Sequence, residues 1–374
     1  MIYELRLKEE LRRKIEDILS RESREKALND HHSRRKPRPC GFTIHTGIGC
    51  SLQCTYCYIG DMGFSWSIRE YPLNGVELVY ALLNNPYFVP GENGSLIAIG
   101  SVTEPFHGVT RTRTLEYIES ISKYLGNPIQ FSTKMYLTRK DALFLRKTDP
   151  GISPLITIVT IKYAERLEPY APPPSKRFKT IKNLREAGLK PILFLRPIIP
   201  GLIEDEYIEL IDQAVDHGAH GLVAGSLRIT RSIIERFKSK RLPVREILER
   251  APCIPKGREQ VSIDTGDLKR EIARYAMRKG LLFFPEACMA NLYTHGRICW
   301  KMIKLGLRVL GDKPPVLNKN EVFKIGQYLG LTVDRIRDRG SYVDIWVKPV
   351  DRVNTTLFSE LVKCRFKKCV RIHK

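Results

Sequence analysis

Three closely spaced cysteines, Cys50, Cys54 and Cys57, are the residues of this chain best suited to chemistry. Their CxxxCxxC spacing puts three thiols on one short loop. A four-iron cluster normally takes four thiolates, so a loop with three leaves one iron open to a substrate or cofactor. The spacing therefore predicts an iron–sulfur site with one free coordination position.

Zinc is the alternative occupant of such a loop. A closed structural zinc site needs four Cys or His ligands, usually as two pairs separated by about a dozen residues or more. Cys40 and His45 lie close enough in the sequence to add a fourth ligand, but no second CxxC pair follows. The aromatic Tyr56 just before the third cysteine favours a cluster loop over a zinc knuckle.

Short β-branched runs alternate with longer helical stretches from Gly41 to about Lys238. Strands are expected over residues 42–45, 96–100, 129–132, 155–161, 191–196 and 221–225, and helices over 75–83, 112–125, 137–146, 176–186, 204–216 and 230–237. This alternation implies βαβ units and a parallel sheet. We therefore expect an α/β fold, a partial (β/α)6 TIM-like barrel that is open and six-stranded.

Chemistry in such barrels lies at the carboxyl ends of the strands, on the loops that lead into the helices. The cysteine loop follows the first expected strand, so it falls at that end. Position alone selects further candidates at the ends of the next strands: Ser101, Glu104, Ser132, Thr133, Lys134, Thr157, Thr160 and Arg196.

The chain divides into four expected parts. Residues 1–39 form a basic helical extension that begins with an amphipathic helix and ends in the basic run His31–Arg38, which could hold phosphates. Residues 40–240 form the barrel, and 241–310 extend it with a helix over 264–279 and a strand over 281–284. Residues 311–374 form a small basic α+β domain with a helix over 320–330 and a strand over 342–347.

Net charge is the second strong signal. The chain carries 63 Lys and Arg against 41 Asp and Glu, a net charge of +22. Such basic chains commonly bind polyanions, because neutralised phosphates release counterions. A thermophile's surface raises Glu along with Lys and stays near balance, so it explains the surplus less well. Nucleic acid is therefore the expected partner.

Neither a membrane span nor a signal peptide is expected, since no apolar stretch is long enough and the first residues are charged. The expected compartment is the cytoplasm. Nine cysteines without an export signal favour metal ligation and free thiols over disulfides. The six outside the loop could provide a hydrogen donor, a methyl-carrying thiolate or a second cluster, or could be small buried hydrophobes: Cys40, Cys253, Cys288, Cys299, Cys364 and Cys369.

With Tyr56 as the aromatic residue, the loop resembles the radical S-adenosylmethionine (SAM) superfamily signature CxxxCxΦC. Further blocks in order resemble its spore photoproduct lyase-like branch over roughly residues 40–240: 46–50, 57–58, 102–106, 112–116, 132–134, 167–172 with Arg177, 187–188, 197–201 and 218–219. The resemblance implies the radical SAM barrel, a [4Fe–4S] cluster and SAM bound to the open iron. An electron donor such as ferredoxin or flavodoxin would then allow SAM to be cleaved to a 5′-deoxyadenosyl radical.

The resemblance also implies roles for single residues. Lys134 is expected to meet the SAM carboxylate, Thr157 to lie near SAM, and Tyr58 to lie against the adenine. Tyr56 and Tyr58 match tyrosines that relay the hydrogen atom in the lyase. The candidate catalytic residues are thus Tyr56, Tyr58 and Ser101. The candidate cofactor-binding residues are Tyr58, Ser101, Glu104, Ser132, Lys134, Thr157 and Arg196, and the candidate metal ligands are Cys50, Cys54 and Cys57.

One departure from the branch concerns its chemistry. The lyase has a hydrogen-donor cysteine at the end of its second strand, where this chain has Gly100 and Ser101. A serine O–H bond is too strong to replace a thiol as a donor to a carbon radical. The resemblance therefore implies the radical generator but not the lyase's own reaction.

The leading hypothesis is a radical SAM enzyme of lyase or transferase class that acts on nucleic acid. RNA base modification is favoured slightly over DNA lesion repair, because single-stranded loops expose their bases to a deep site. Two alternatives stay open: modification of a peptide or protein, and a non-catalytic Fe–S protein that binds nucleic acid or senses redox state.

Overall fold

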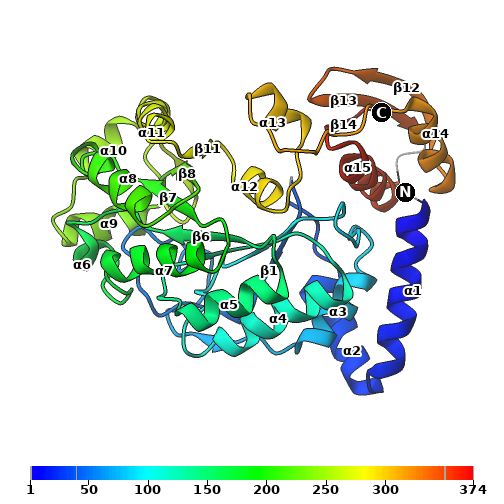
Figure 1. Ribbon diagram of the computed structural model, residues 1–374, viewed down its shortest axis with the longest axis horizontal. Coiled ribbons are helices and arrows are strands. Elements are labelled where there is room, and N and C mark those ends of the chain that lie inside the picture. The colour runs from blue at the N-terminus through cyan, green and yellow to red at the C-terminus, as the bar shows by residue number, and fades with distance from the viewer. Residues whose placement is uncertain (1, 39, 349–350, 374) are drawn as a thin grey trace.

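A seven-stranded parallel sheet forms the body of the protein. The computed structural model describes residues 2–38, 40–348 and 351–373 (Figure 1). The sheet order is β1-β4-β5-β6-β7-β8-β11, and every neighbouring pair is parallel. Its strands are β1 (Phe42–Ile44), β4 (Ile97–Ile99), β5 (Ile129–Thr133), β6 (Ser153–Thr157), β7 (Ile192–Ile198), β8 (Gly221–Ser226) and β11 (Leu282–Phe284).

This sheet confirms the predicted α/β fold of the open barrel type. All six expected strands form, and the stretch expected to extend the sheet adds the seventh strand beside β8. The fourth strand was expected over residues 155–161, but β6 ends at Thr157, so Thr160 lies beyond the strand. β6 also begins before the expected range, so Pro154 belongs to the strand, and all five of its residues are buried.

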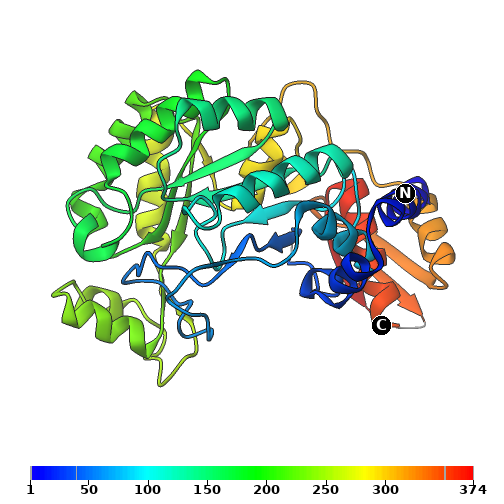
Figure 2. The ribbon, with the colours of Figure 1, turned by 90° about the horizontal axis from the view of Figure 1, so that it is seen from below.

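Helices connect the strands and cover the outside of the sheet (Figures 1 and 2). They are α3 (Gly75–Asn84), α4 (Arg111–Tyr124), α5 (Arg139–Thr148), α7 (Pro174–Glu186), α8 (Tyr207–Asp216) and α11 (Gly266–Arg278), whereas α9 (Arg231–Ser239) packs with the cysteine loop. Local sequence sets where they begin: capping boxes start α3 at Asn74 and α5 at Thr138, and Pro174 opens α7. The expected helix over 204–216 is split into a short 3-10 turn, η2 (Ile203–Asp205), and α8.

Smaller elements frame the mouth of the barrel. They are β2 (Gly47–Ile48), β3 (Arg69–Glu70), α6 (Ala164–Leu167), β9 (Arg228–Ile229), α10 (Arg245–Glu249) and β10 (Val261–Ser262). β2 pairs with β3 and β9 with β10, both antiparallel. The main core joins buried strand residues such as Ile44 and Phe131 to helix residues such as Leu82, Ile121 and Ile181.

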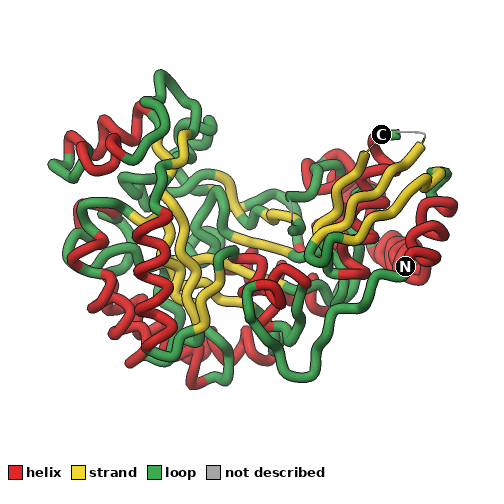
Figure 3. Tube along the Cα trace, turned by 90° about the horizontal axis from the view of Figure 1, so that it is seen from above, coloured by secondary structure: helices red, strands yellow, loops and turns green. Residues whose placement is uncertain are grey.

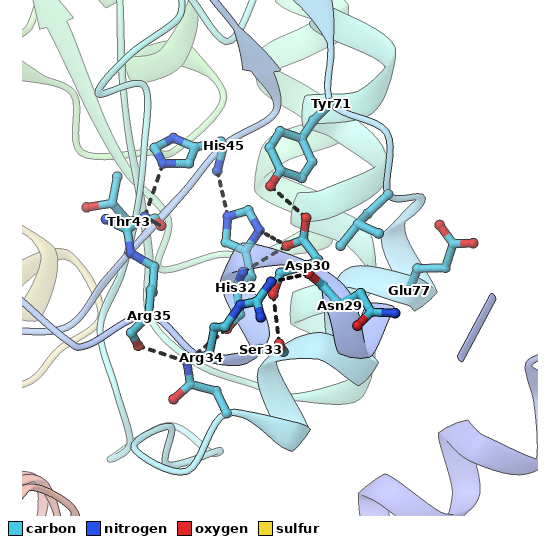
Figure 4. A network of polar contacts seen from close by, with 12 residues as sticks. Asn29, Asp30, His32, Ser33, Arg34, Arg35, Thr43, His45, Tyr71 and Glu77 are labelled. Carbon is cyan, nitrogen blue, oxygen red and sulfur yellow. Dashed lines mark hydrogen bonds and ion pairs between the residues drawn. The ribbon is translucent and has the colours of Figure 1, made fainter. Parts of the chain in front are cut away.

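The amino-terminal part has two helices where one was expected: α1 (Ile2–Ile18) and α2 (Arg21–Asn29), followed by the 3-10 turn η1 (His31–Ser33). Its basic run is partly structural, as Figure 4 shows. His32 is fully buried, with its Nδ1 2.7 Å from Asp30, and Arg35 donates to the Thr43 carbonyl at 2.6 Å. In the rest of this run, the exposed basic side chains that could make other contacts are those of Arg34, Lys36 and Arg38.

The carboxyl-terminal part is a second, smaller α+β unit. It comprises α14 (Lys319–Tyr328), β12 (Thr332–Asp338), β13 (Tyr342–Lys348), α15 (Arg352–Phe366) and β14 (Cys369–His373). Its three strands form a sheet of order β12-β13-β14, which Figure 3 shows apart from the main sheet. Val343, Ile345, Phe358 and Leu361 lie in its separate core.

Two short helices, α12 (Ala287–Thr294) and α13 (Trp300–Lys304), lie between the barrel and this carboxyl-terminal unit (Figure 1). The amino-terminal helix α1 runs beside the carboxyl-terminal unit, and its Leu5 packs against the core of that unit. Across the described residues, no helix is long and apolar enough to cross a membrane.

Candidate active site

The cysteine loop leaves β2 and folds back on itself. Cys50 donates its backbone N–H to the Ser65 carbonyl at 3.2 Å, and Cys57 donates to the Cys54 carbonyl at 2.9 Å. Gly49, which precedes the first cysteine, has φ +79°, and a Cβ there would lie 2.1 Å from the Ser67 carbonyl oxygen. The loop therefore needs glycine at this position to close.

The loop is held in place by α9 and α6. Arg236 of α9 donates from Nε to the Thr55 carbonyl at 3.0 Å and from Nη2 to the Cys57 carbonyl. Thr55 donates its hydroxyl to the Arg166 carbonyl at 2.8 Å. Asp61 accepts hydrogen bonds from Thr230 and Ser232, at 2.9 and 2.8 Å. These contacts fix the loop against α6, which follows β6, and against α9, which follows β9.

All eleven candidate site residues face one cavity of about 360 Å³ at the carboxyl end of the sheet: Cys50, Cys54, Tyr56, Cys57, Tyr58, Ser101, Glu104, Ser132, Lys134, Thr157 and Arg196. Thr133 lines it as well. Thr160 does not, because its buried hydroxyl donates to Glu206 at 2.6 Å. The volume is in the range of small-molecule and cofactor pockets, about 300–1,000 Å³.

Lys134 lies over the ring of Tyr56, with its Nζ 5.6 Å from the ring centroid and 4.0 Å from Glu168 Oε1. Burial acts to lower the pKa of Lys134, but the charges of Cys54 and of Glu168 outweigh it and hold the pKa above its ordinary value. The amine is therefore a cation inside the cavity.

Behind Lys134 lies a fully buried ion pair between Glu168 and Arg177. The Tyr56 hydroxyl also donates to Glu168, and burial together with that carboxylate raises the pKa of Tyr56. Arg177 donates further to the carbonyls of Pro172, at 2.7 Å, and Thr157, at 3.2 Å. The hydroxyl of Tyr56 is thus directed at Glu168, and this network supports the cavity wall.

Glu104 makes its hydrogen bonds to neighbouring groups of the protein. Its carboxylate accepts from the Thr133 hydroxyl and from the backbone N–H groups of Lys134, at 2.9 Å, and Phe106, at 3.2 Å. Burial raises its pKa. Because each oxygen already has donors, Glu104 holds the carboxyl end of β5 and thereby the backbone of Lys134.

Gly100 and Ser132 make a close contact across neighbouring strands. Gly100 has φ +102°, and a Cβ there would meet the Ser132 carbonyl oxygen at 2.6 Å. The Ser132 hydroxyl donates to the Gly100 carbonyl at 3.3 Å. Only a glycine fits at position 100, whereas the side chain of Ser101 is exposed at the cavity.

Cationic and aromatic side chains gather on the far wall. Arg196 passes over Gly225, where a Cβ would lie 2.7 Å from its Cδ, and within the described part of the chain it has no carboxylate partner. Arg228 lines the same cavity and donates a hydrogen bond to the neutral Gln260 side chain at 3.2 Å. Tyr58 and Trp66 supply aromatic surface. This wall suits an anionic or aromatic ligand.

The sequence did not assign roles to three residues that shape the site. Glu168 and Arg177 were part of the matching blocks, but their mutual pairing is visible only in the fold. Arg236 had no local signal, because it contacts the cysteine loop from α9, about 180 residues further along the chain.

The donor set fits an iron–sulfur cluster. Three thiols face one cavity beside a cation and apolar side chains, including Leu52 and Leu227. Thiolates are the ligands that iron–sulfur centres require, and burial raises the pKa of Cys54 to about 12, so metal binding there would release a proton. The three cysteines would hold the cluster, and the cavity beside them has room for a second ligand.

Comparisons with known proteins agree with this geometry. Residues 44–214 match the model of the radical SAM superfamily. An uncharacterized protein of Acidianus two-tailed virus is 24% identical over 175 residues, which are 43% of this chain and 56% of that protein. An uncharacterized protein of Methanocaldococcus jannaschii is 27% identical over 178 residues, 45% of this chain and 64% of that protein. The match thus spans less than two thirds of the length of these two relatives.

Solved structures of spore photoproduct lyase have a similar fold. A mutant lyase with bound AdoMet and dinucleoside spore photoproduct has a TM-score of 0.53 and 16% identity, covering 68% of this chain and 79% of that chain. A second mutant has a TM-score of 0.51 and 18% identity, covering 65% and 75%. At such identity the likeness establishes the fold alone.

Proposed function

We propose that the protein is a radical SAM enzyme acting on nucleic acid, since residues 44–214 match the model of the radical SAM superfamily. Cys50, Cys54 and Cys57 would hold a [4Fe–4S] cluster, and SAM would occupy the cavity beside it. When bound, the cluster would supply the electron that cleaves SAM reductively, with ferredoxin or flavodoxin as its donor. The observation that carries the proposal is the convergence of the three thiols and Lys134 on one cavity.

Lys134 is placed to bind the carboxylate of SAM. Its side chain is partly buried and cationic, and it lines the cavity that the cysteines line. Glu168 and Arg177 keep it there, while Glu104 fixes its backbone. The aromatic side chains of Tyr58 and Trp66 provide surfaces against which a purine could stack.

Charge supports a nucleic-acid substrate. The chain has a net charge of +22, and two of its cations, Arg196 and Arg228, line the cavity without a carboxylate partner among the described residues. Phosphate groups are the natural counterparts of such cations. RNA modification is the favoured form, because Ser101 replaces the thiol on which the lyase reaction depends and because unpaired RNA bases can enter a deep cavity.

The first experiment tests SAM cleavage. Protein reconstituted with iron and sulfide under anaerobic, reducing conditions should convert SAM to 5′-deoxyadenosine, which chromatography with mass detection measures. Lys134→Ala should keep the iron of the cysteine loop but lose at least about tenfold in SAM affinity, the effect of about 1.4 kcal/mol. Lys140→Ala removes an exposed lysine on α5 and is the matched control. A fully loaded enzyme that leaves SAM intact would contradict the proposal.

The second experiment tests the substrate. Binding of RNA and DNA oligonucleotides should weaken steeply as salt rises, because phosphate contacts release counterions. Nucleosides from cells lacking the gene, compared by mass spectrometry with those of the parent, should lack one modified base. Binding that is insensitive to salt and unchanged nucleosides would instead favour a peptide substrate.

A further inference from the structure

Five of the six cysteines outside the loop converge on a second cavity. Cys40, Cys288, Cys299, Cys364 and Cys369 all line it. They come from the segment before β1, from α12, from the N-cap of α13, from α15 and from β14. The sixth, Cys253, is exposed and lies outside this lining. Segments more than 300 residues apart thus bring their thiols to the junction of the barrel and the carboxyl-terminal unit.

Two thiols of this group are spaced as metal ligands are. The Sγ atoms of Cys40 and Cys288 and a carboxylate oxygen of Glu286 all lie within 4.8 Å of one another. Cys299 and Cys369 lie outside this close group but line the same cavity, Cys299 from the N-cap of α13 and Cys369 from β14. Cys364 differs from the other four because it also lines a separate cavity, together with Val89 and Arg297. The thiols of Cys40 and Cys288 are thus close enough to share a metal, and Cys299 and Cys369 line the same cavity.

The size and lining of the cavity favour a cluster over a single ion. The cavity has about 80 Å³, whereas one water needs about 10–15 Å³ by the same measure. Its wall includes the apolar Leu96, Met289 and Leu292. An apolar wall excludes water and suits iron–sulfur centres.

The charged residues around the cavity also suit a thiolate-bound centre. Four lysines line it: Lys301, Lys363, Lys367 and Lys368. Lys301 pairs with Glu286, so that carboxylate already has a cationic partner and is less available as a metal ligand. Lys367 bonds a neutral carbonyl, that of Asn93 at 2.9 Å. Lys363 and Lys368 pair with Glu360 and Asp338. A cluster with four thiolates carries net negative charge, and Lys367 is the lining lysine placed to offset it.

We propose that Cys40, Cys288, Cys299 and Cys369 bind a second iron–sulfur cluster that joins the carboxyl-terminal unit to the barrel. This centre is separate from the loop of Cys50, Cys54 and Cys57. Three of its ligands belong to the barrel and the helices that follow it, and Cys369 belongs to the carboxyl-terminal sheet. The cluster ties the two parts together where the backbone contributes contacts such as Trp300 N–H to the Lys367 carbonyl, at 3.1 Å.

The second centre lies at the opposite end of β1 and β4 from the first centre. Gly41 and Leu96 precede β1 and β4 and line the second cavity, whereas Thr43 and Gly100 line the first. Successive strand residues rise about 3.3 Å, so only a few residues of strand separate the two cavities. On α12, Ala287 lines the first cavity and its neighbour Cys288 lines the second.

The test is the metal content of the whole chain with the first site removed. The variant with Cys50→Ala, Cys54→Ala and Cys57→Ala, reconstituted anaerobically, should still hold about four iron and four acid-labile sulfide per chain, as a [4Fe–4S] centre requires. Electron paramagnetic resonance of the reduced protein should show one cluster. If this variant folds but holds no iron, or holds a single zinc without sulfide, the proposal is wrong.

Further variants test the ligands. Adding Cys40→Ser and Cys288→Ser to that background should remove the remaining iron, whereas adding Cys253→Ser should leave it. Adding Cys364→Ser should also leave it, and loss there would overturn the choice of ligands. If the triple variant does not fold, as circular dichroism would show, the unaltered chain decides: about eight iron per chain supports two clusters, and about four contradicts them.

Discussion

The guanidinium of Arg177 and the carboxylate of Glu168 form an ion pair in which neither side chain is exposed to solvent. The pair connects α7 to the segment after α6 and lies directly behind Tyr56 and Lys134. Removing one partner leaves the other charge buried and unpaired, which lowers the free energy of unfolding strongly. Replacing both partners with apolar side chains has a much smaller effect.

Arg177→Met should therefore lower the free energy of unfolding by about 3 kcal/mol or more, measured by urea denaturation. The double variant Arg177→Met, Glu168→Gln should cost less than the sum of the two single changes, because no buried charge is left. Lys182→Ala, which removes an exposed pair with Glu186, should cost less than about 1 kcal/mol. Equal losses for Arg177→Met and Lys182→Ala would contradict this view of the network.

Arg236 should control the order of the cysteine loop. Arg236→Met removes its hydrogen bonds to the carbonyls of Thr55 and Cys57, leaving both without this donor at a cost of about 1–3 kcal/mol each if they stay buried. Amide hydrogen exchange of a peptide covering residues 50–62 should become faster. Lys238→Met on the exposed face of α9 is the control and should leave exchange unchanged. Unaltered exchange in Arg236→Met would show that the loop orders itself.

A cysteine at position 100 should destabilise the protein, whereas a cysteine at position 101 should leave its stability nearly unchanged. Gly100→Cys places a Cβ 2.6 Å from the Ser132 carbonyl oxygen at positive φ, so the backbone must shift. We expect a loss of about 2 kcal/mol or more in the free energy of unfolding. Ser101→Cys, at an exposed side chain, should change it by less than about 0.5 kcal/mol. A stable Gly100→Cys protein would mean that β4 and β5 can separate at this point.

Asp30 should make stability depend on pH. Burial alone would raise the pKa of Asp30, but hydrogen bonds from His32 and Tyr71 and the charge of His32 lower it to about 2 (Figure 4). Its pKa in the unfolded chain is about 3.9. Because the folded pKa is the lower one, the stabilisation is fully present above about pH 4 and is lost as the pH falls through about 2.

Asp30→Asn should accordingly lower the free energy of unfolding by up to about 2 kcal/mol near neutral pH. The difference from the unaltered chain should shrink as the pH falls below about 4. Urea denaturation over a pH series measures it, with the exposed Asp17→Asn as control. A difference that stays constant down to about pH 3 would rule out the assigned coupling to His32 and Tyr71.

Much of the barrel was predictable because its signals are local. Hydrophobic periodicity located the six strands, and Asn74 and Thr138 marked where two helices begin. The errors also have local causes: Ile158 and Val159 are buried and β-branched like strand residues, yet the chain turns after Thr157 toward the contact of Thr160 with Glu206. The second amino-terminal helix was missed because its residues are mostly polar.

The sequence by itself determined the cysteine loop and the presence and order of the barrel strands, since CxxxCxxC spacing and strand periodicity need only neighbouring residues. Only the tertiary structure decided which distant side chains meet. Glu168 reaches Tyr56 and Lys134, and Arg236 reaches the loop, because the barrel closes α6 and α9 over it. Cys40 and Cys369 form part of one centre because the carboxyl-terminal unit packs beside the first strand, a contact for which no spacing in the sequence provides a signal.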